Sequence, residues 1–155
     1  MNRRTFLKSA TAGAVFTIVP ASVLVKPGRT APSDKLDIAL IGVGGRGRRN
    51  LQGVSSENIV AMCDVDQQRA SESFLKYPDA KTYVDFRVLL DNEHNNIDAV
   101  VVSTPDHTHG PAVMAALQLK KHVYCEKPLA HSLYEVRKIT ETAREAGVAT
   151  QMGNQ

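Results

Sequence analysis

The chain contains no tryptophan, and aromatic residues make up only 5% of its 155 residues. A hydrophobic core must therefore consist mainly of aliphatic side chains, which suits the packing of helices on a sheet. Cysteine is equally scarce, because Cys63 and Cys125 are the only two, each at the end of a short apolar run. The two runs predict strands that are not neighbours, whereas a disulfide needs Cα atoms within about 7 Å. We therefore expect two buried thiols rather than a disulfide.

A long, strongly apolar run is also missing. The uncharged stretch at residues 9–25 is interrupted by Gly13 and Pro20, whereas a stable membrane span needs about 20 strongly apolar residues. Residues 2–8, Asn-Arg-Arg-Thr-Phe-Leu-Lys, precede it and resemble a twin-arginine export signal. We expect a signal peptide at residues 1–29, a linker at 30–35 and export to the periplasm by the twin-arginine machinery. The alternative is a basic N-terminal helix of a cytoplasmic protein.

An excess of positive charge is absent outside this leader. Six of the 19 Lys and Arg residues and one of the 16 acidic residues lie in residues 1–35. The remaining 120 residues therefore carry 13 basic and 15 acidic side chains. The basic isoelectric point thus belongs to the leader and gives no reason to expect a nucleic-acid partner.

Glycine, in contrast, is concentrated after the first apolar run of the following region. Residues 38–41, Ile-Ala-Leu-Ile, suit one buried parallel strand, and three glycines then have G-x-G-x-x-G spacing. This spacing suits a tight turn, a close approach of the backbone to a pyrophosphate, and close packing of a helix whose N-terminus attracts phosphate. The predicted phosphate-binding turn comprises Gly42, Gly44, Gly45, Arg46 and Gly47.

A second apolar run, residues 59–63, ends on Asp64, which lies 22 residues after Gly42. An acid at this distance accepts hydrogen bonds from the hydroxyls of a ribose. Its charge repels the additional phosphate of NADP, so NAD is the expected cofactor and NADP the less favoured one. The order of strand, glycine turn, helix, strand and acid predicts a dinucleotide site. A glycine-rich turn in another doubly wound protein, such as a methyltransferase, is the alternative.

Strands and helices alternate along the rest of the chain. The expected strands span residues 38–41, 59–63, 82–84, 99–103, 122–125 and 148–152, and the expected helices follow the glycine turn and span residues 66–76, 85–90, 109–119 and 133–146. This alternation predicts an α/β fold with a doubly wound parallel sheet of the Rossmann type, in the strand order 3-2-1-4-5-6. Such sheets bind ligands at the carboxyl ends of their strands. Four segments would then converge there: the glycine turn, Asp64, Thr104-Pro105 and Glu126-Lys127-Pro128.

Lys127 follows the fifth predicted strand and precedes Pro128, which favours an extended backbone at the lysine. Its ammonium group could bind a substrate oxygen and exchange a proton with it while a hydride moves. A surface lysine paired with Glu126 is the alternative.

Histidine and arginine near the predicted strand ends allow further interpretations. Residues 106–109, Asp-His-Thr-His, contain a His-x-His pair but no third ligand at a recognisable spacing. A helix N-terminus is therefore expected there rather than a metal site, and His109 is a candidate for a position near the cofactor. Arg46, Arg48 and Arg49 could reach phosphate, although at least two of them are expected to be solvated.

Three segments, in this order, resemble the Gfo/Idh/MocA oxidoreductases, the group of glucose–fructose oxidoreductase and inositol dehydrogenase. They are the glycine turn with Asp64, residues 103–109 (Ser-Thr-Pro-Asp-His-Thr-His) and residues 122–129 (His-Val-Tyr-Cys-Glu-Lys-Pro-Leu). The resemblance covers residues 36–155 and implies binding of NAD(P) by the glycine turn and Asp64, with sugars, inositols or related polyols as substrates. It further implies that Thr104, Pro105 and His109 line the nicotinamide side, that Glu126 contacts the cofactor, and that Lys127 lies near the substrate hydroxyl.

Members of this family carry a second α/β domain, which supplies most substrate contacts, a catalytic His/Asp region and the oligomer interface. The chain ends at Gln155, where that domain would begin, so we expect either a fragment or a truncated product. The favoured reading is the NAD(P)-binding domain of an exported sugar or polyol oxidoreductase that needs the second domain for turnover and for any homo-oligomer. A truncated, non-catalytic nucleotide-binding module is the alternative.

Overall fold

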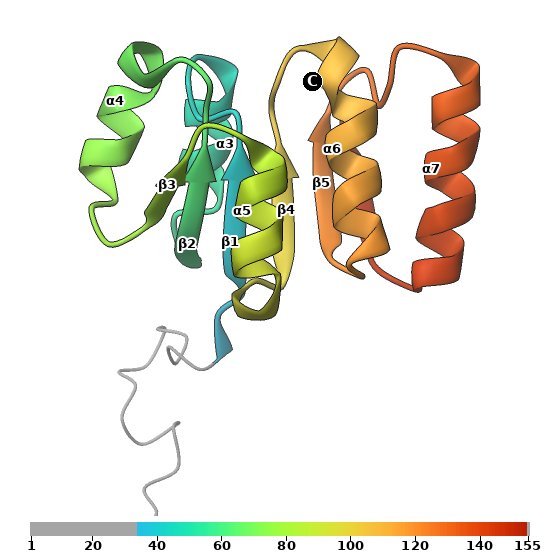
Figure 1. The fold of residues 1–155 in the computed structure, drawn as a ribbon, viewed down its shortest axis with the longest axis horizontal. Helices are drawn as coiled ribbons and strands as arrows, with labels where there is room; N and C mark the ends of the chain where they lie inside the picture. Colours follow the sequence, from blue (N-terminus) through green and yellow to red (C-terminus); the bar gives the residue numbers. More distant parts are fainter. Residues whose placement is uncertain (1–33, 155) are drawn as a thin grey trace, which may run out of the picture. The chain divides into compact units, whose positions relative to one another are not determined.

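The computed structural model describes residues 34–154, which form one six-stranded sheet with helices on both faces (Figure 1). The strands are β1 (Asp37–Ile41), β2 (Asn58–Cys63), β3 (Lys81–Tyr83), β4 (Ala99–Val102), β5 (His122–Glu126) and β6 (Thr150–Gly153). The helices are α3 (Arg46–Gly53), α4 (Gln67–Lys76), α5 (Phe86–Glu93), α6 (Asp106–Gln118) and α7 (Leu133–Ala146), with the short 3-10 helix η2 (His94–Asn96) after α5.

The strand order is β3-β2-β1-β4-β5-β6, and every neighbouring pair is parallel. This confirms the predicted Rossmann-type sheet and its order 3-2-1-4-5-6. The carboxyl ends of all six strands therefore lie at one edge. The order changes direction between β1 and β4, and in sheets of this kind ligands bind at that point.

Two hydrophobic cores flank the sheet, one on each face. Alternate residues of β1 point to opposite sides, so Ile38 and Leu40 pack with α3 and α4, whereas Ala39 and Ile41 pack with α5, α6 and α7. The helices α5, α6 and α7 lie in front of the sheet in Figure 1. Burial on both faces explains why the central strands read as continuous apolar runs.

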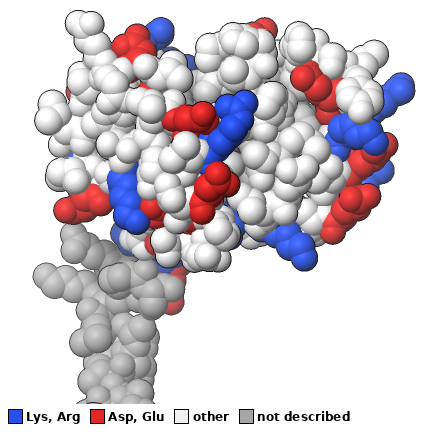
Figure 2. Space-filling view, viewed as in Figure 1, with Lys and Arg blue, Asp and Glu red and all other residues white. Residues whose placement is uncertain are grey.

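Charges of both signs are mixed on the face seen in Figure 2, mainly over α5 and α7, with few over α6. Within residues 34–154, no helix is long and apolar enough to cross a membrane. The predicted twin-arginine signal and most of the predicted linker lie outside the described residues.

Most helix ends agree with the sequence-based expectations. The Asp66 side chain caps α4 by accepting the N–H of Arg69 at 2.9 Å, and Ser132 caps α7 by accepting the N–H of Glu135 at 3.3 Å. The prediction for α6 was wrong at its start, because the helix begins at Asp106 rather than His109. The polar residues of its first turn hide the start from an argument based on apolar spacing.

Cys63 and Cys125 are buried free thiols on β2 and β5, and β1 and β4 lie between them. Burial raises the pKa of each thiol to about 12, with a smaller contribution from the neighbouring carboxylate, Asp64 or Glu126. Both thiols are therefore protonated near neutral pH and act as small apolar side chains.

Candidate functional site

The turn between β1 and α3 is held by close backbone contacts; we call residues 42–47 the glycine loop. Gly42 has a φ of 84°, in the left-handed region, and its N–H donates to the Cys63 carbonyl at 2.7 Å. A Cβ placed on Gly47 would lie 1.9 Å from the Gly42 carbonyl oxygen. Glycine is therefore required at both positions, which are the first and third of the G-x-G-x-x-G motif.

Asp64, at the end of β2, binds the glycine loop directly. Its Oδ2 accepts the N–H groups of Val43 and Gly44, each at 2.9 Å. The N–H groups of Gly45 and Arg46 have no hydrogen-bond partner among the described residues, and they lie at the N-terminus of α3. Unpaired donors at a helix N-terminus suit a phosphate group, so the loop fits the pyrophosphate of NAD.

A cavity of about 690 Å³ opens beside the glycine loop; we call it the edge cavity. Six of the residues expected to bind the cofactor line it: Gly42, Gly44, Arg46, Asp64, Thr104 and Pro105. The other six are not among its lining residues: Gly45, Gly47, His109, Glu126, Lys127 and Pro128. The Oγ1 atom of Thr104 is buried and has no partner within residues 34–154, so this residue of the cavity wall has an unused hydrogen-bonding group.

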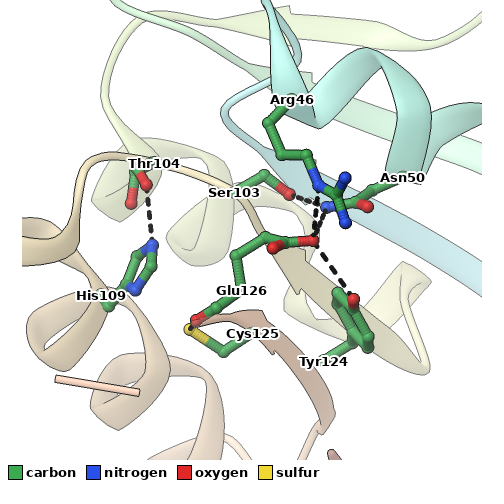
Figure 3. Close-up of polar contacts among 8 residues, drawn as sticks. All are labelled: Arg46, Asn50, Ser103, Thr104, His109, Tyr124, Cys125 and Glu126. Carbon is green, nitrogen blue, oxygen red and sulfur yellow. Dashed lines mark hydrogen bonds and ion pairs between the residues drawn. The ribbon is translucent and has the colours of Figure 1, made fainter. Parts of the chain in front are cut away.

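Glu126 is buried at the end of β5 and fastens that strand to α3 (Figure 3). Its Oε1 accepts hydrogen bonds from Arg46 Nε at 3.1 Å and Asn50 Nδ2 at 2.9 Å. The Tyr124 hydroxyl donates to the same oxygen at 3.2 Å, and Asn50 also donates to Ser103 Oγ at 2.7 Å. Burial raises the pKa of Glu126, but the bonds from Asn50 and Arg46 and the arginine charge outweigh it, so its pKa is lower than usual.

The network bears on the role that the resemblance implied for Glu126. Its Oε1 is engaged by residues of α3, and Glu126 is not among the residues that line the edge cavity, so its contact with the cofactor stays a prediction. Of the three arginines near the loop, Arg46 lines the cavity, Arg48 pairs with Glu72 of α4, and Arg49 is exposed. Glu126 thus holds Arg46 at the cavity wall.

Lys127 and Pro128 are exposed in the turn after β5, and the peptide bond between them is cis. Because the described partners of Glu126 are Arg46, Asn50 and Tyr124, the alternative of a Lys127–Glu126 surface pair is not what the structure shows. The proton-transfer role of Lys127 stays a prediction. Its ammonium group is accessible, as that role requires.

His109 lies inside the fold, with only 1% of its surface exposed. Its Nδ1 is 2.6 Å from the Pro128 carbonyl oxygen, and its Nε2 is 2.7 Å from the Thr104 carbonyl oxygen. It therefore connects two turns rather than lining the edge cavity. His107, two residues earlier, does line the cavity. Within residues 34–154, no three His, Cys, Asp or Glu side chains form a group suited to a metal ion.

Arg69 of α4 was not expected from the sequence. It lines the edge cavity and lies across the glycine loop. A Cβ on Gly44 would be 2.9 Å from Arg69 Cγ, and one on Gly45 would be 2.7 Å from Arg69 Nη2. The signal was present in the sequence: Arg69 follows Asp64 by five residues, and Asp66 caps its N–H. That position, in the first turn of the helix after the acid, points the side chain towards the loop.

The fold and this site define a dinucleotide-binding domain of the Rossmann type. Comparison with known families agrees, since residues 36–154 match the family described as "Oxidoreductase family, NAD-binding Rossmann fold". The chain therefore belongs to the Gfo/Idh/MocA oxidoreductase family, and residues 36–154 are its NAD-binding domain.

Individual relatives agree with this assignment. The chain is 36% identical to "Myo-inositol 2-dehydrogenase" of Thermotoga maritima, over 72% of the chain and 34% of the relative. It is 34% identical to "Glucose-6-phosphate 3-dehydrogenase" of Bacillus subtilis, over 75% of the chain and 33% of the relative. The crystal structure of a probable dehydrogenase from Thermotoga maritima superposes with a TM-score of 0.67 at 35% identity, covering 76% of this chain and 36% of that one. The chain thus spans about a third of the length of these relatives.

Proposed function

We propose that this chain supplies the cofactor-binding part of an oxidoreductase that transfers a hydride between NAD and a hydroxyl-bearing carbon of a sugar or polyol. The observation that carries the proposal is the edge cavity, because the glycine loop, Asp64 and Thr104 meet there at the carboxyl ends of β1, β2 and β4. The names of the relatives, which act on an inositol and a sugar phosphate, support this substrate class.

Binding of NAD would use groups that the fold already presents. The unpaired N–H groups of Gly45 and Arg46 at the start of α3 would hold the pyrophosphate, and the positive end of the α3 dipole would add to their attraction. The Asp64 carboxylate already accepts three backbone N–H groups, those of Val43, Gly44 and Asp66. Its two oxygens offer about four acceptor sites, so it can still accept a ribose hydroxyl. When bound, NAD supplies the hydride acceptor or donor.

The proton of the reaction would be handled by Lys127. Oxidation of an alcohol releases a hydride from carbon and a proton from oxygen, so a basic group must lie near the hydroxyl. The exposed Lys127, at the end of β5 in the same sheet edge, is the residue of this chain that we assign to that proton. Asn50, Glu126 and the side chain of Arg46 act indirectly by fixing α3 against β5.

The export proposal concerns residues 1–29, which we infer to be a twin-arginine signal peptide leading the protein to the periplasm. The twin-arginine pathway carries folded proteins, so NAD would be bound in the cytoplasm and retained during export. Replacing Arg3 and Arg4 by Lys should leave the protein in the cytoplasm, as cell fractionation would show. Unchanged export of that variant would contradict the proposal.

A binding measurement with the 155-residue chain tests the dinucleotide site. NADH fluorescence should change on titration with the chain, and the change should be lost in Gly44→Val, since a side chain there meets Arg69. Gly147→Asn is the matched control, because the added Cβ meets no atom within 4 Å and asparagine tolerates the left-handed φ of 67°. Absence of any NADH binding by the folded chain would overturn the proposed function.

An activity measurement separates the oxidoreductase from a non-catalytic nucleotide-binding module. The module is the second candidate because the chain spans about a third of its relatives. Reduction of NAD by inositols and sugars should be undetectable with this chain alone if the catalytic unit includes a further domain. Turnover by the 155-residue chain would show that no further domain is needed.

A further inference from the structure

The side chain of His109 makes two contacts of the same kind. Nδ1 lies 2.6 Å from the carbonyl oxygen of Pro128, and Nε2 lies 2.7 Å from that of Thr104. Figure 3 shows the ring pointing to the turn that contains Thr104. Both distances are hydrogen-bonding distances. Both partners are backbone carbonyls, which accept hydrogen bonds and cannot donate them.

A neutral imidazole cannot satisfy this arrangement, because it carries a hydrogen on only one of its two nitrogens. The other nitrogen would then direct a lone pair at a carbonyl oxygen less than 3 Å away. Turning the ring over does not help, because it would direct C–H groups at the two oxygens and leave both carbonyls unpaired. Only an imidazolium ion donates from both ends.

We propose that His109 holds a proton on both ring nitrogens and thereby fixes the turn bearing Lys127 to the turn after β4. His109 is then a positioning residue, and its two N–H groups bridge two segments that carry no regular hydrogen bonds between them. Among the described residues, neither the Thr104 nor the Pro128 carbonyl accepts a bond from any other donor. A contribution of His109 to catalysis rests on the role proposed for Lys127. The double protonation of the His109 ring does not depend on that role.

The surroundings of His109 include features that oppose a positive charge on the ring and others that stabilise it. Burial and the positive N-terminal end of α6 oppose a charge on the ring, whereas the two short carbonyl contacts stabilise it. Titratable groups lie in the first turn of α6 and at the ends of the elements packed against this helix: Asp106 and His107 on α6, Asp85 and Arg87 at the start of α5, Glu126 and Lys127 at the end of β5, and His131 and Glu135 at the start of α7. Asp85 is paired with Arg87. Glu126 is paired with Arg46, and Glu135 with His131 at 2.9 Å. The carbonyl oxygens are therefore the principal partners of the charge.

Loss of one of the two ring protons of His109 should release either the turn that contains Thr104 or the turn that contains Pro128. As the pH rises, the deprotonated nitrogen faces a carbonyl oxygen, and one of the two bonds is lost. The backbone around Lys127 or around Thr104 then moves, so the position of the Lys127 ammonium group becomes dependent on pH. A residue that only filled space at this position would produce no such dependence.

The test is the imidazole proton–nitrogen correlation spectrum of the 155-residue chain without cofactor. His109 should show two proton-bearing ring nitrogens at neutral pH, because each of its nitrogens faces a carbonyl oxygen. The backbone amides of Lys127 and Leu129 should shift with the same midpoint as the His109 ring. The spectrum needs no bound dinucleotide, so its outcome is independent of the proposed NAD site.

Assignment does not depend on a variant of His109 that could fail to fold. The chain has five histidines, and replacing the other four by Gln, one at a time, identifies the signals of His109 by elimination. His107→Gln is the matched control and should leave the pH response of the Lys127 amide unchanged. A His109 ring with one bare nitrogen at neutral pH in the folded chain would overturn the proposal, as would Lys127 and Leu129 amides that ignore its titration.

Discussion

Gly47 has no room for any side chain, because a Cβ there would meet the Gly42 carbonyl oxygen at 1.9 Å. We expect Gly47→Ala to destabilise the chain by more than about 2 kcal/mol, since backbone rather than a flexible side chain must move, and to weaken NADH binding. Gly53 lies in the same helix and meets nothing within 4 Å, so Gly53→Ala should stabilise the chain by up to about 1 kcal/mol. Urea unfolding measures both changes. Equal stability of the two variants would contradict this account of the loop.

Glu93 is a buried carboxylate whose surroundings predict a pH dependence of stability. Hydrogen bonds from Lys81 and then from the Tyr83 hydroxyl outweigh burial and lower the pKa of Glu93 to about 2, while the same carboxylate raises the pKa of Tyr83 to about 12. The folded state binds this proton less readily than the unfolded state, whose carboxyl has a pKa near 4.5. The stabilisation is therefore complete above pH 4.5 and is lost as the pH falls towards 2.

Replacing Glu93 by Gln removes the titrating group but keeps an acceptor for Lys81. The free energy of unfolding of this variant should fall less steeply than that of the parent chain between pH 4.5 and pH 2. Glu141→Gln is the control, since this residue pairs with Lys138 on the exposed surface, where such pairs contribute about 0–1 kcal/mol. Identical pH profiles for the parent chain and the Glu93 variant would show that the buried pair does not carry the effect.

At the scale of elements, Glu126 joins α3 to β5. Glu126→Leu leaves the hydrogen-bonding groups of Asn50 and Tyr124 without their carboxylate, which should cost about 1–3 kcal/mol. It should also weaken NADH binding, because the N-terminus of α3 loses its anchor. The exposed Arg48–Glu72 pair joins α3 to α4, so Glu72→Leu should change stability by about 1 kcal/mol or less. NADH titration and thermal unfolding of both variants compare the two contacts.

The elements themselves follow closely from local sequence signals. Apolar runs predicted the strands, such as those that end in the glycine turn and in Asp64. Capping residues, Asp66 and Ser132, predicted helix starts. Each of these signals acts within a few residues. The start of α6 was missed because its first turn, residues 106–108, is polar and carries no apolar spacing. Local signals therefore predicted the elements but not every boundary, whereas the strand order followed from the alternation of strands and helices.

The interior of the site could be predicted only in part. Tyr124 and Glu126 are two apart on a strand, and Arg46 and Asn50 are four apart on a helix, so each pair shares a face. The contact between the strand pair and the helix pair, however, joins segments about 80 residues apart in the sequence. It depends on how α3 packs against β5. His109 is the same kind of case: its burial follows from two turns closing over it, and its spacing in the sequence gives no sign of that.

For the whole molecule, cofactor choice and stability are linked, because a ligand that binds only the folded chain stabilises it. NADH at 100 times its dissociation constant would add about 2.7 kcal/mol, and hence raise the midpoint of thermal unfolding by about 10 °C for a domain of this size. NADPH should raise it less, because its additional phosphate would approach the Asp64 carboxylate.

Asp64→Asn should narrow this difference, since it removes the charge but keeps an oxygen for the N–H groups of Val43 and Gly44. The Asp66 N–H, which Asp64 Oδ1 accepts at 3.0 Å, loses its acceptor in this variant. Asp66→Asn is the matched control: it removes a second charge at the same cavity while asparagine still caps α4. Thermal unfolding of each variant with NADH and with NADPH makes the comparison. Repulsion by Asp64 is not the basis of the preference for NADH over NADPH if the two coenzymes stabilise the parent chain equally, or if both variants change that preference alike. Arg69, which lies over the glycine loop, would then have to account for the coenzyme preference.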